Sequence, residues 1–425
     1  MQMKKVVSLM VSVLMLINPI AGVLAEEEQT ETSAAVEEQV QMSVAVEVLA
    51  PDAAGNTEVT KTADEIDASG EGDQYGAIVN GDAATAALTV ENGINAASSD
   101  GTAVGASVSS SSEQGSASLV SGSVAATSEG ADADGLVVST AGKESETAVK
   151  AADISATSKE GNASAVTAGA SGDQNNTQVT SGNLSSEGKS SAAGIMAHSD
   201  SGSNLDPDEV VGSENKVTVT AGNVTASAEN STTAVAAETS GEKNAIEVNT
   251  GDISSEGNTS ATGIRTNTNV REPWASEEDF GVENTITIKA GNVDSNSADG
   301  SATGVAVNAS GEKTVTEVST GDIASVGTNA ATGIVVKENN YDRELYGENI
   351  VSSENKVIVN AGNINATSSD GSARAVDAEI TGDNNTAEVS TGDISAAGKD
   401  IAYGISEDVS GKGNTLDITS KKHFS

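Results

Sequence analysis

A four-residue pattern of Ala or Thr, Gly, Asn or Asp, and Ile or Val recurs along most of the chain, and no other feature constrains the fold as strongly. Clear copies end at Val224, Ile253, Val293, Ile323, Ile364 and Ile394, and looser copies end at Ile94, Val124, Ile154 and Leu184. Successive copies are separated by 30, 30, 30, 40, 29, 40, 30, 41 and 30 residues. The sequence therefore repeats about every 30 residues, with some repeats lengthened by about ten.

Each period holds three short apolar segments separated by turn residues. One segment precedes the anchor glycine, as in Asn244-Ala-Ile-Glu-Val248, the second begins at the anchor, and the third contains a pair such as Gly263-Ile264. Clusters of Gly, Asn, Asp and Ser lie between them. Three short strands and three turns in about 30 residues are typical of one coil of a parallel β-solenoid, so we expect an all-β fold.

The composition agrees with a narrow core. Trp, Tyr and Phe together make up 2% of the 425 residues, and the chain contains 44 glycines and no cysteine. So few aromatic side chains cannot fill the cores of ordinary domains of this total size. A column of Ile, Val and Ala running through stacked coils needs none, and disulfides or thiol chemistry are excluded.

Two columns of polar residues are predicted to follow from the stacking. An asparagine lies seven residues before the anchor glycine, and we expect its side-chain amide to donate to that of the next coil. Tolerance of left-handed turn dihedrals is a compatible alternative reason for asparagine there. The ladder residues are Asn215, Asn244, Asn284, Asn355, Asn385 and Asn414.

The residue after the anchor glycine alternates between neutral and charged along the repeats. From Asn223 onward the order is Asn223, Asp252, Asn292, Asp322, Asn363, Asp393. Coils stacked at ~4.8 Å would place adjacent aspartates in repulsive contact. Alternation separates the carboxylates to nearly ~10 Å, about one Debye length, which favours direct stacking of each coil on the last.

The chain divides into regions of different composition. Residues 1–25 combine two lysines with a short apolar run and small residues before Glu26, which predicts a secretory signal peptide, and no later apolar run has transmembrane length. We interpret residues 26–39 as an acidic disordered leader, 40–79 as an N-terminal strand or cap region, 80–418 as the solenoid, and 419–425 as a tail.

Insertions interrupt the repeat at one phase only, at residues 197–214, 267–283 and 337–354. They contain four of the seven aromatic residues, which makes these the candidate ligand contacts, because loops on rigid scaffolds often carry binding residues. The alternative is that each aromatic covers its own loop. The candidates are Trp274, Phe280, Tyr341 and Tyr346. Carboxylates in the insertions are weak candidates for a calcium site, although no EF-hand pattern is present; they are Asp206, Asp208, Glu277 and Asp279.

The charge balance limits the partners. The chain has 63 acidic and 21 basic residues, a net charge of −42, and removal of Lys4 and Lys5 with the signal peptide would make it −44. Such a field repels nucleic acid. A β-helix polysaccharide lyase or hydrolase is an alternative function, but the two histidines, His198 and His423, have no evident nucleophile partner, and we expect no enzyme activity and no cofactor. A self-associating rod without catalysis is a third alternative.

The repeat units resemble those of bacterial haemagglutinins and autotransporter passenger regions, which are β-solenoid adhesins. The resemblance rests on units such as Asn385–Ile394 followed by Ala402–Ile405 and extends over residues 80–418. It implies a secreted or cell-surface protein that binds a host or cell-surface protein or glycan. The translocator barrel and the sorting or anchor motif of those families are not recognisable, and the pattern departs after Ile418, where Lys421 and Lys422 stand near the expected next anchor.

Overall fold

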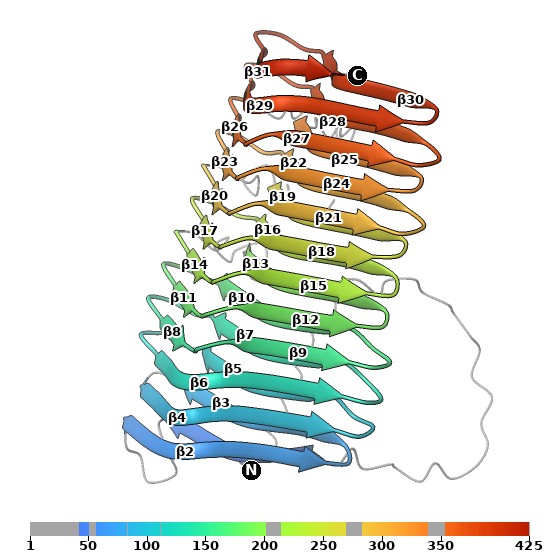
Figure 1. The fold of residues 1–425 in the computed structure, drawn as a ribbon. Helices are drawn as coiled ribbons and strands as arrows, with labels where there is room; N and C mark the ends of the chain where they lie inside the picture. Colours follow the sequence, from blue (N-terminus) through green and yellow to red (C-terminus); the bar gives the residue numbers. More distant parts are fainter. Residues whose placement is uncertain are drawn as a thin grey trace, which may run out of the picture. The chain divides into compact units, whose positions relative to one another are not determined.

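The described residues form two parallel β-sheets that coil around a shared core. The computed structural model describes residues 42–50, 57–82, 84–111, 113–200, 214–268, 283–338 and 353–424, all in one compact unit, Val40–Ser425. Strands of successive coils pair in parallel, about 30 residues apart, in about 11 turns, and Figure 1 follows them in chain order from β2 to β31. The predicted all-β parallel solenoid is confirmed.

The first sheet has 12 strands, one from each coil. Its strands follow one another in chain order, and each connection between neighbours crosses over through the second sheet. Its strands are β1 (Met42–Ala50), β3 (Asp73–Gly81), β5 (Ala103–Ser110), β7 (Ala133–Thr140), β10 (Ala163–Ser171), β13 (Ser191–Asp200), β16 (Ser231–Thr239), β19 (Ser260–Thr268), β22 (Ser301–Ala309), β25 (Ala330–Glu338), β28 (Ser372–Ile380) and β30 (Ile401–Val409).

The second sheet has 19 strands because most coils contribute two short strands to it, one on each side of the anchor glycine. Those before the glycine are β8 (Glu146–Lys150), β11 (Asn176–Thr180), β14 (Lys216–Thr220), β17 (Ala245–Asn249), β20 (Thr285–Lys289), β23 (Val315–Ser319) and β26 (Lys356–Asn360). Those after it are β9 (Ile154–Ser158), β12 (Leu184–Gly188), β15 (Val224–Ala228), β18 (Ile253–Gly257), β21 (Val293–Ser297), β24 (Ile323–Gly327) and β27 (Ile364–Ser368).

In the remaining coils the two short strands merge into one long strand. These long strands are β2 (Glu58–Gly70), β4 (Thr85–Ser98), β6 (Ser116–Ser128), β29 (Thr386–Gly398) and β31 (Thr415–Phe424). Strands β1, β2 and β3 therefore place most of the predicted cap region, 40–79, in the same two sheets, and the predicted boundary at residue 80 falls inside β3. The predicted signal peptide and leader, 1–39, lie outside the described residues.

The core is a stack of aliphatic columns between the two sheets. One column holds the second apolar residue of each first segment, as in Val219, Val248 and Ile288, which pair in register and are fully buried. The anchor column holds Ile253, Val293 and their equivalents. Because every coil contributes the same few small side chains, burial is continuous although aromatics are scarce.

The repeat at Thr314 keeps the register of its neighbours despite its divergent sequence. Val315 pairs with Thr285 and Lys356 at an outward position, and Val318 stays in the core column. Thr316 takes the inner position that Ile286 fills in the coil before. Thr314 and Thr316 therefore replace Asn and Ile at two positions of the repeat, and the strand does not slip.

Candidate functional site

The most regular exposed feature of the coils is the column of Asn and Asp residues after the anchor glycine. The backbone N–H of each residue donates to Oδ1 of the residue in the preceding coil, at 2.7–3.0 Å. We call this column the anchor ladder; its members are Asp153, Asn183, Asn223, Asp252, Asn292, Asp322, Asn363 and Asp393. From Asn223 onward the expected alternation brings an amide between each pair of carboxylates.

The anchor glycines are required by this ladder. A Cβ on Gly251 would lie 2.3 Å from Oδ1 of Asn223, and a Cβ on Gly291 would lie 2.3 Å from Oδ1 of Asp252. The glycine N–H groups also bond from coil to coil, as from Gly251 to the carbonyl of Gly222 at 2.9 Å. The Gly-Asn and Gly-Asp pairs therefore make a tight corner in which the backbone ladder continues.

At this corner the outer surface of the 19-stranded sheet is hollowed. A shallow hollow of about 430 Å³ extends over several coils, and Asn, Asp and Ser side chains line it together with the anchor isoleucines and Ala324. The lining residues are Asn292, Asp294, Asp322, Ile323, Ala324, Asn363, Ile364, Asn365, Asp393, Ile394 and Ser395. Rigid, evenly spaced amides and carboxylates of this kind can bind hydroxyl or cationic groups of an extended ligand.

The predicted asparagine ladder is buried and lies at the start of the strand that precedes the anchor glycine, whereas the anchor ladder follows that strand. Asn215, Asn244, Asn284, Asn355 and Asn385 are each at most 1% exposed. The structure brings them together, but the ladder bonds run from a backbone N–H to Oδ1 of the next coil, as from Asn215 to Asn244 at 2.9 Å. Equivalent bonds at 2.9–3.0 Å reach Asn175, Asn215, Asn284, Asn355, Asn385 and Asn414. We expected each side-chain amide to donate to the next one, but the donors of these ladder bonds are backbone N–H groups.

The side-chain nitrogens of the same asparagines close the adjacent turn. Nδ2 of Asn284 donates to the carbonyl of Gly241 at 2.7 Å, and Nδ2 of Asn385 donates to that of Thr381 at 2.9 Å. The left-handed backbone lies one residue earlier in each coil, so the alternative explanation for these asparagines is wrong. The ladder is best explained as a device that satisfies buried backbone groups.

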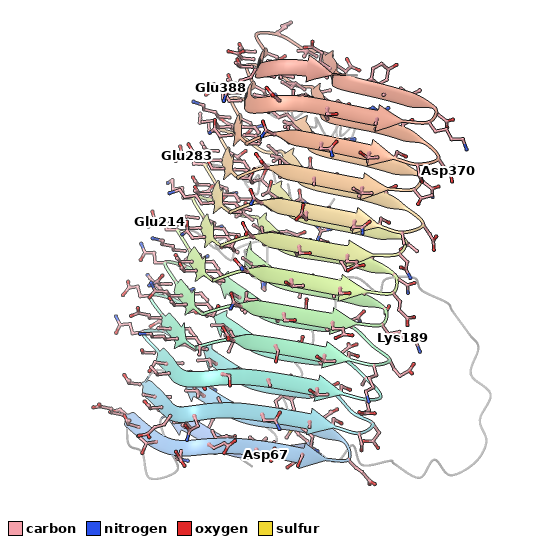
Figure 2. All side chains as sticks on the ribbon, viewed as in Figure 1. Asp67, Lys189, Glu214, Glu283, Asp370 and Glu388 are labelled. Atoms are coloured by element: carbon pink, nitrogen blue, oxygen red, sulfur yellow. The ribbon has the colours of Figure 1, made fainter. Side chains whose placement is uncertain are left out.

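The left-handed residues form a column that the sequence did not reveal. Nine residues other than glycine have φ between 53° and 59°, one per coil; they are Gln114, Glu144, Gln174, Glu214, Lys243, Glu283, Lys313, Glu354 and Asn384. Figure 2 shows Glu214 and Glu283 along this edge. From Gln114 onward every glutamate has a neutral or basic neighbour in the adjacent coils. Nε2 of Gln174 donates to Glu214 at 2.9 Å.

The opposite edge carries exposed ion pairs between adjacent coils. Lys399 pairs with Asp370 at 2.8 Å, and Lys189 pairs with Glu160; Lys189 and Asp370 are labelled in Figure 2. Because both partners are solvated, such pairs contribute little to folding stability. They place lysines of this acidic chain beside carboxylates of the adjacent coil.

The candidate ligand contacts of the insertions lie outside the described residues. This holds for Trp274, Phe280, Tyr341 and Tyr346 and for the weak calcium candidates Asp206, Asp208, Glu277 and Asp279. The insertions leave the same sheet at equivalent points, after β13, β19 and β25, and return before β14, β20 and β26. Strand β16 lies between β13 and β19, and β22 lies between β19 and β25, with the strand ends in register. The roots of the three insertions therefore lie on one edge, at every second coil.

Two carboxyl groups are buried in the 12-stranded sheet. Burial raises the pKa of Glu338 to about 8, and burial with a smaller contribution from Asp132 raises the pKa of Asp134 to about 7. Burial, with Asp73 and Asp134, raises the pKa of Tyr75 to about 12. Within the described ranges, no group of three or more His, Cys, Asp or Glu side chains is placed to hold a metal ion.

The histidines considered for the alternative enzyme function lie in different sheets. His198 is in β13 and His423 is in β31. Comparison with protein families, curated proteins and solved structures gave no match. In the part of the chain that the structure describes, no helix is both long and apolar enough to cross a membrane.

Proposed function

We propose that the protein is an exported, noncatalytic binding and spacer protein of the cell surface or extracellular space. Its ligand would be a host or cell-surface protein or a glycan. The observation that carries the proposal is the strip of exposed amides and carboxylates along the anchor ladder, which lines one shallow hollow over the coils from Asn292 to Asp393.

The backbone supports this role because the strip is fixed in place. Each ladder side chain from Asp153 to Asn363 accepts a hydrogen bond from the next coil and packs against a glycine of that coil that admits no side chain. A surface that does not reorganise on binding loses little conformational entropy, so weak polar contacts can add along an extended ligand. The net charge of −42 favours ligands that are neutral or cationic.

The sequence contributes two further arguments. The repeats resemble those of haemagglutinin and autotransporter passenger regions, whose solenoids act as adhesins. The segment 1–25 has the composition of a signal peptide, which would deliver the chain outside the cytoplasm. The two insertions that contain aromatic residues, 267–283 and 337–354, would then extend the binding surface from one edge.

The first experiment tests export. The full chain is expressed in a bacterial host and the fractions are analysed by N-terminal sequencing. We expect a mature protein that starts at Glu26 outside the cytoplasm, and retention of an unprocessed chain in the cytoplasm would contradict the proposal.

The second experiment tests binding. The chain from Glu26 is labelled and titrated onto intact cells, immobilised glycans and matrix proteins. We expect saturable binding that falls at least tenfold in the combined variant Trp274→Ala, Phe280→Ala, Tyr341→Ala, Tyr346→Ala or in Asp294→Ala, Asn365→Ala. Ser254→Ala, which is in register with Asp294 but outside the hollow, is the matched control. Depolymerisation of a polyuronide, with or without calcium, would favour the enzyme alternative.

A further inference from the structure

We propose that the first and last coils of the described stack are complementary and that a second copy of this chain stacks head to tail, with Glu407 of one copy paired with Lys61 of the next. The first coil is formed by β1 and β2, and the last coil by β30 and β31. This inference does not depend on the proposed binding role.

Both coils present open sheet edges among the described residues. β1 pairs with β3 and β30 with β28, and these are the two outer strands of the 12-stranded sheet. β2 pairs with β4 and β31 with β29. Open edges carry unpaired backbone N–H and C=O groups and are templates for pairing with another chain.

The cross-sections of the two coils match. Strand register is continuous from the first coil to the last, so residues 58–62 and 66–67 of β2 are equivalent to 415–419 and 423–424 of β31, and residues 43–49 of β1 are equivalent to 402–408 of β30. A copy placed at the next coil spacing would therefore continue the core columns that contain these residues. Ile401 and Val409 of the last coil are 42% and 46% exposed, and both would lie at the contact with the next copy.

Two core columns end in a charged residue, at opposite ends of the stack. Lys61 begins a column whose later members include Leu88, Leu119 and Val149 and which ends at Ile418. Glu407 ends a column that begins at Val48 and contains Val, Ala and Thr at every position between. One end of the stack therefore carries a cation and the other end an anion, and a head-to-tail contact brings these two opposite charges together.

The two charges would also meet across the core. Nζ of Lys61 donates to the backbone carbonyl of Glu47 at 2.5 Å, so the side chain reaches from the 19-stranded sheet to the 12-stranded sheet. Glu47 is next to Val48, and in the stacked arrangement Glu407 of the other copy lies over Val48, ~4.8 Å away. The ammonium and the carboxylate are then within ion-pair reach in a site shielded from water.

Pairing of like ends is disfavoured by the same residues. Two last coils would oppose one Glu407 with another, and two first coils would oppose one Lys61 with another. Residues 42–73 also carry eight acidic residues and one basic residue, a net charge of −7, whereas residues 398–425 carry four of each, a net charge of 0. A head-to-tail contact is heterologous and continues into a filament unless its rotation closes a ring.

Sedimentation velocity and negative-stain microscopy of the full chain, and of the chain from Glu26, test the proposal. At ~0.15 M salt, which screens the net charge, we expect species larger than dimers that grow with concentration in both chains. A monomer at every concentration up to ~100 μM, or association that needs residues 1–25, would overturn it.

Charge-swap variants test the pair itself. Lys61→Glu and Glu407→Lys should each weaken association at least tenfold, because like charges then face one another. The double variant, and an equimolar mixture of the two single variants, should recover it. Failure of both to recover association would contradict the pairing of Lys61 with Glu407.

A separate variant distinguishes a junction from simple protection of an open edge, since inward charges also block edge pairing. Lys61→Leu leaves Glu407 of the neighbouring copy buried without a partner, so we expect association to weaken at least tenfold. If Lys61 instead protects the edge, the same variant will associate more strongly than the wild type. Thermal unfolding of each variant chain, compared with the wild type, controls for loss of the fold.

Discussion

The backbone N–H of Asp252 donates to Oδ1 of Asn223 at 2.9 Å, so the side chain of the earlier coil bonds to the later one. In the buried ladder the direction is reversed, because the N–H of Asn215 donates to Oδ1 of Asn244, which belongs to the later coil. Each coil is therefore tied to its neighbours by two sets of bonds of opposite direction. A coil that shifted by one residue would lose both sets, which helps to explain why register is kept over 12 strands.

The first prediction concerns an anchor glycine. Gly251→Ala places a Cβ where Oδ1 of Asn223 now lies, at 2.3 Å, so the side chain of Asn223 must move and its bond from Asp252 is lost. We expect a loss of about 1–3 kcal/mol of folding free energy. Urea unfolding measures it, and the same substitution in an Asn223→Ala background should cost less. Strict additivity of the two substitutions would contradict this explanation.

The second prediction compares the two ladders. Asn244→Ala removes a buried acceptor and leaves the N–H of Asn215 without it, which should cost about 1–3 kcal/mol. Asn223→Ala removes the equivalent bond at an exposed position where water can replace it, so we expect a smaller loss, about 0.5–1.5 kcal/mol. Urea midpoints of the two variants should rank in that order. A larger loss for Asn223→Ala would show that burial does not set the difference.

Much of the fold could be predicted because each coil must repeat its neighbour. Segments such as Asn244–Val248 and the anchor at Ile253 recur at the same positions within each repeat. Such constant spacing is expected when equivalent residues of successive coils stack on one another. The direction of the ladder bonds could not be predicted, since an asparagine amide can both donate and accept. Thr314 could not be placed by pattern either, yet its N–H and hydroxyl both donate to Oδ1 of Asn355, at 3.0 and 2.8 Å.

The column of residues with positive φ and the buried carboxyl group of Glu338 could not be predicted from sequence patterns either. Lys243 and Glu283 adopt positive φ, a conformation that long side chains seldom take, and neither is an Asn or Gly that would indicate it. Glu338 ends an apolar strand at the start of a predicted insertion, where a solvated glutamate is the normal expectation. Asn292, Asp322, Asn363 and Asp393 were predicted to stack in a column, but the hollow that they line together with Asp294 and Asn365 was not predicted, because its concavity follows from the corner geometry and not from spacing.

The third prediction tests charge alternation along the left-handed column. Lys243→Glu would place three glutamates in succession with Glu214 and Glu283, ~4.8 Å apart from coil to coil. We expect the melting temperature to fall at low salt and to recover in part at ~0.5 M salt, as the repulsion is screened. Lys243→Gln, which keeps a long side chain without adding a negative charge, is the control and should fall less. Equal shifts for both variants, independent of salt, would contradict a role for charge.

The last prediction concerns the interior carboxyl of Glu338. Its side chain is fully buried, and neither carboxyl oxygen has a hydrogen-bond partner among the described residues. Its neighbours in register are Ala309 and Ile380, which offer no compensating charge. Burial therefore raises the pKa from an ordinary 4.5 to about 8.

The direction of the pH effect follows from this raised pKa. Below pH 4.5 the carboxyl is protonated in both the folded and the unfolded chain. Between pH 4.5 and 8 the unfolded chain releases the proton while the folded chain retains it, so the free energy of unfolding falls as the pH rises, by an amount on the order of several kcal/mol, and the loss is complete above pH 8. Asp134 adds a loss of the same sign up to about pH 7.

Glu338→Gln isolates this contribution because the amide cannot ionise while the other groups, including Asp134, remain. We expect the variant to gain stability relative to the wild type progressively from pH 4.5 to 8, with a constant difference outside that window. Urea unfolding at closely spaced pH values measures the difference. A wild-type and variant pair whose difference is flat across the window would mean that Glu338 ionises in the folded chain at its ordinary pKa, with water or a cation reaching it inside the sheet.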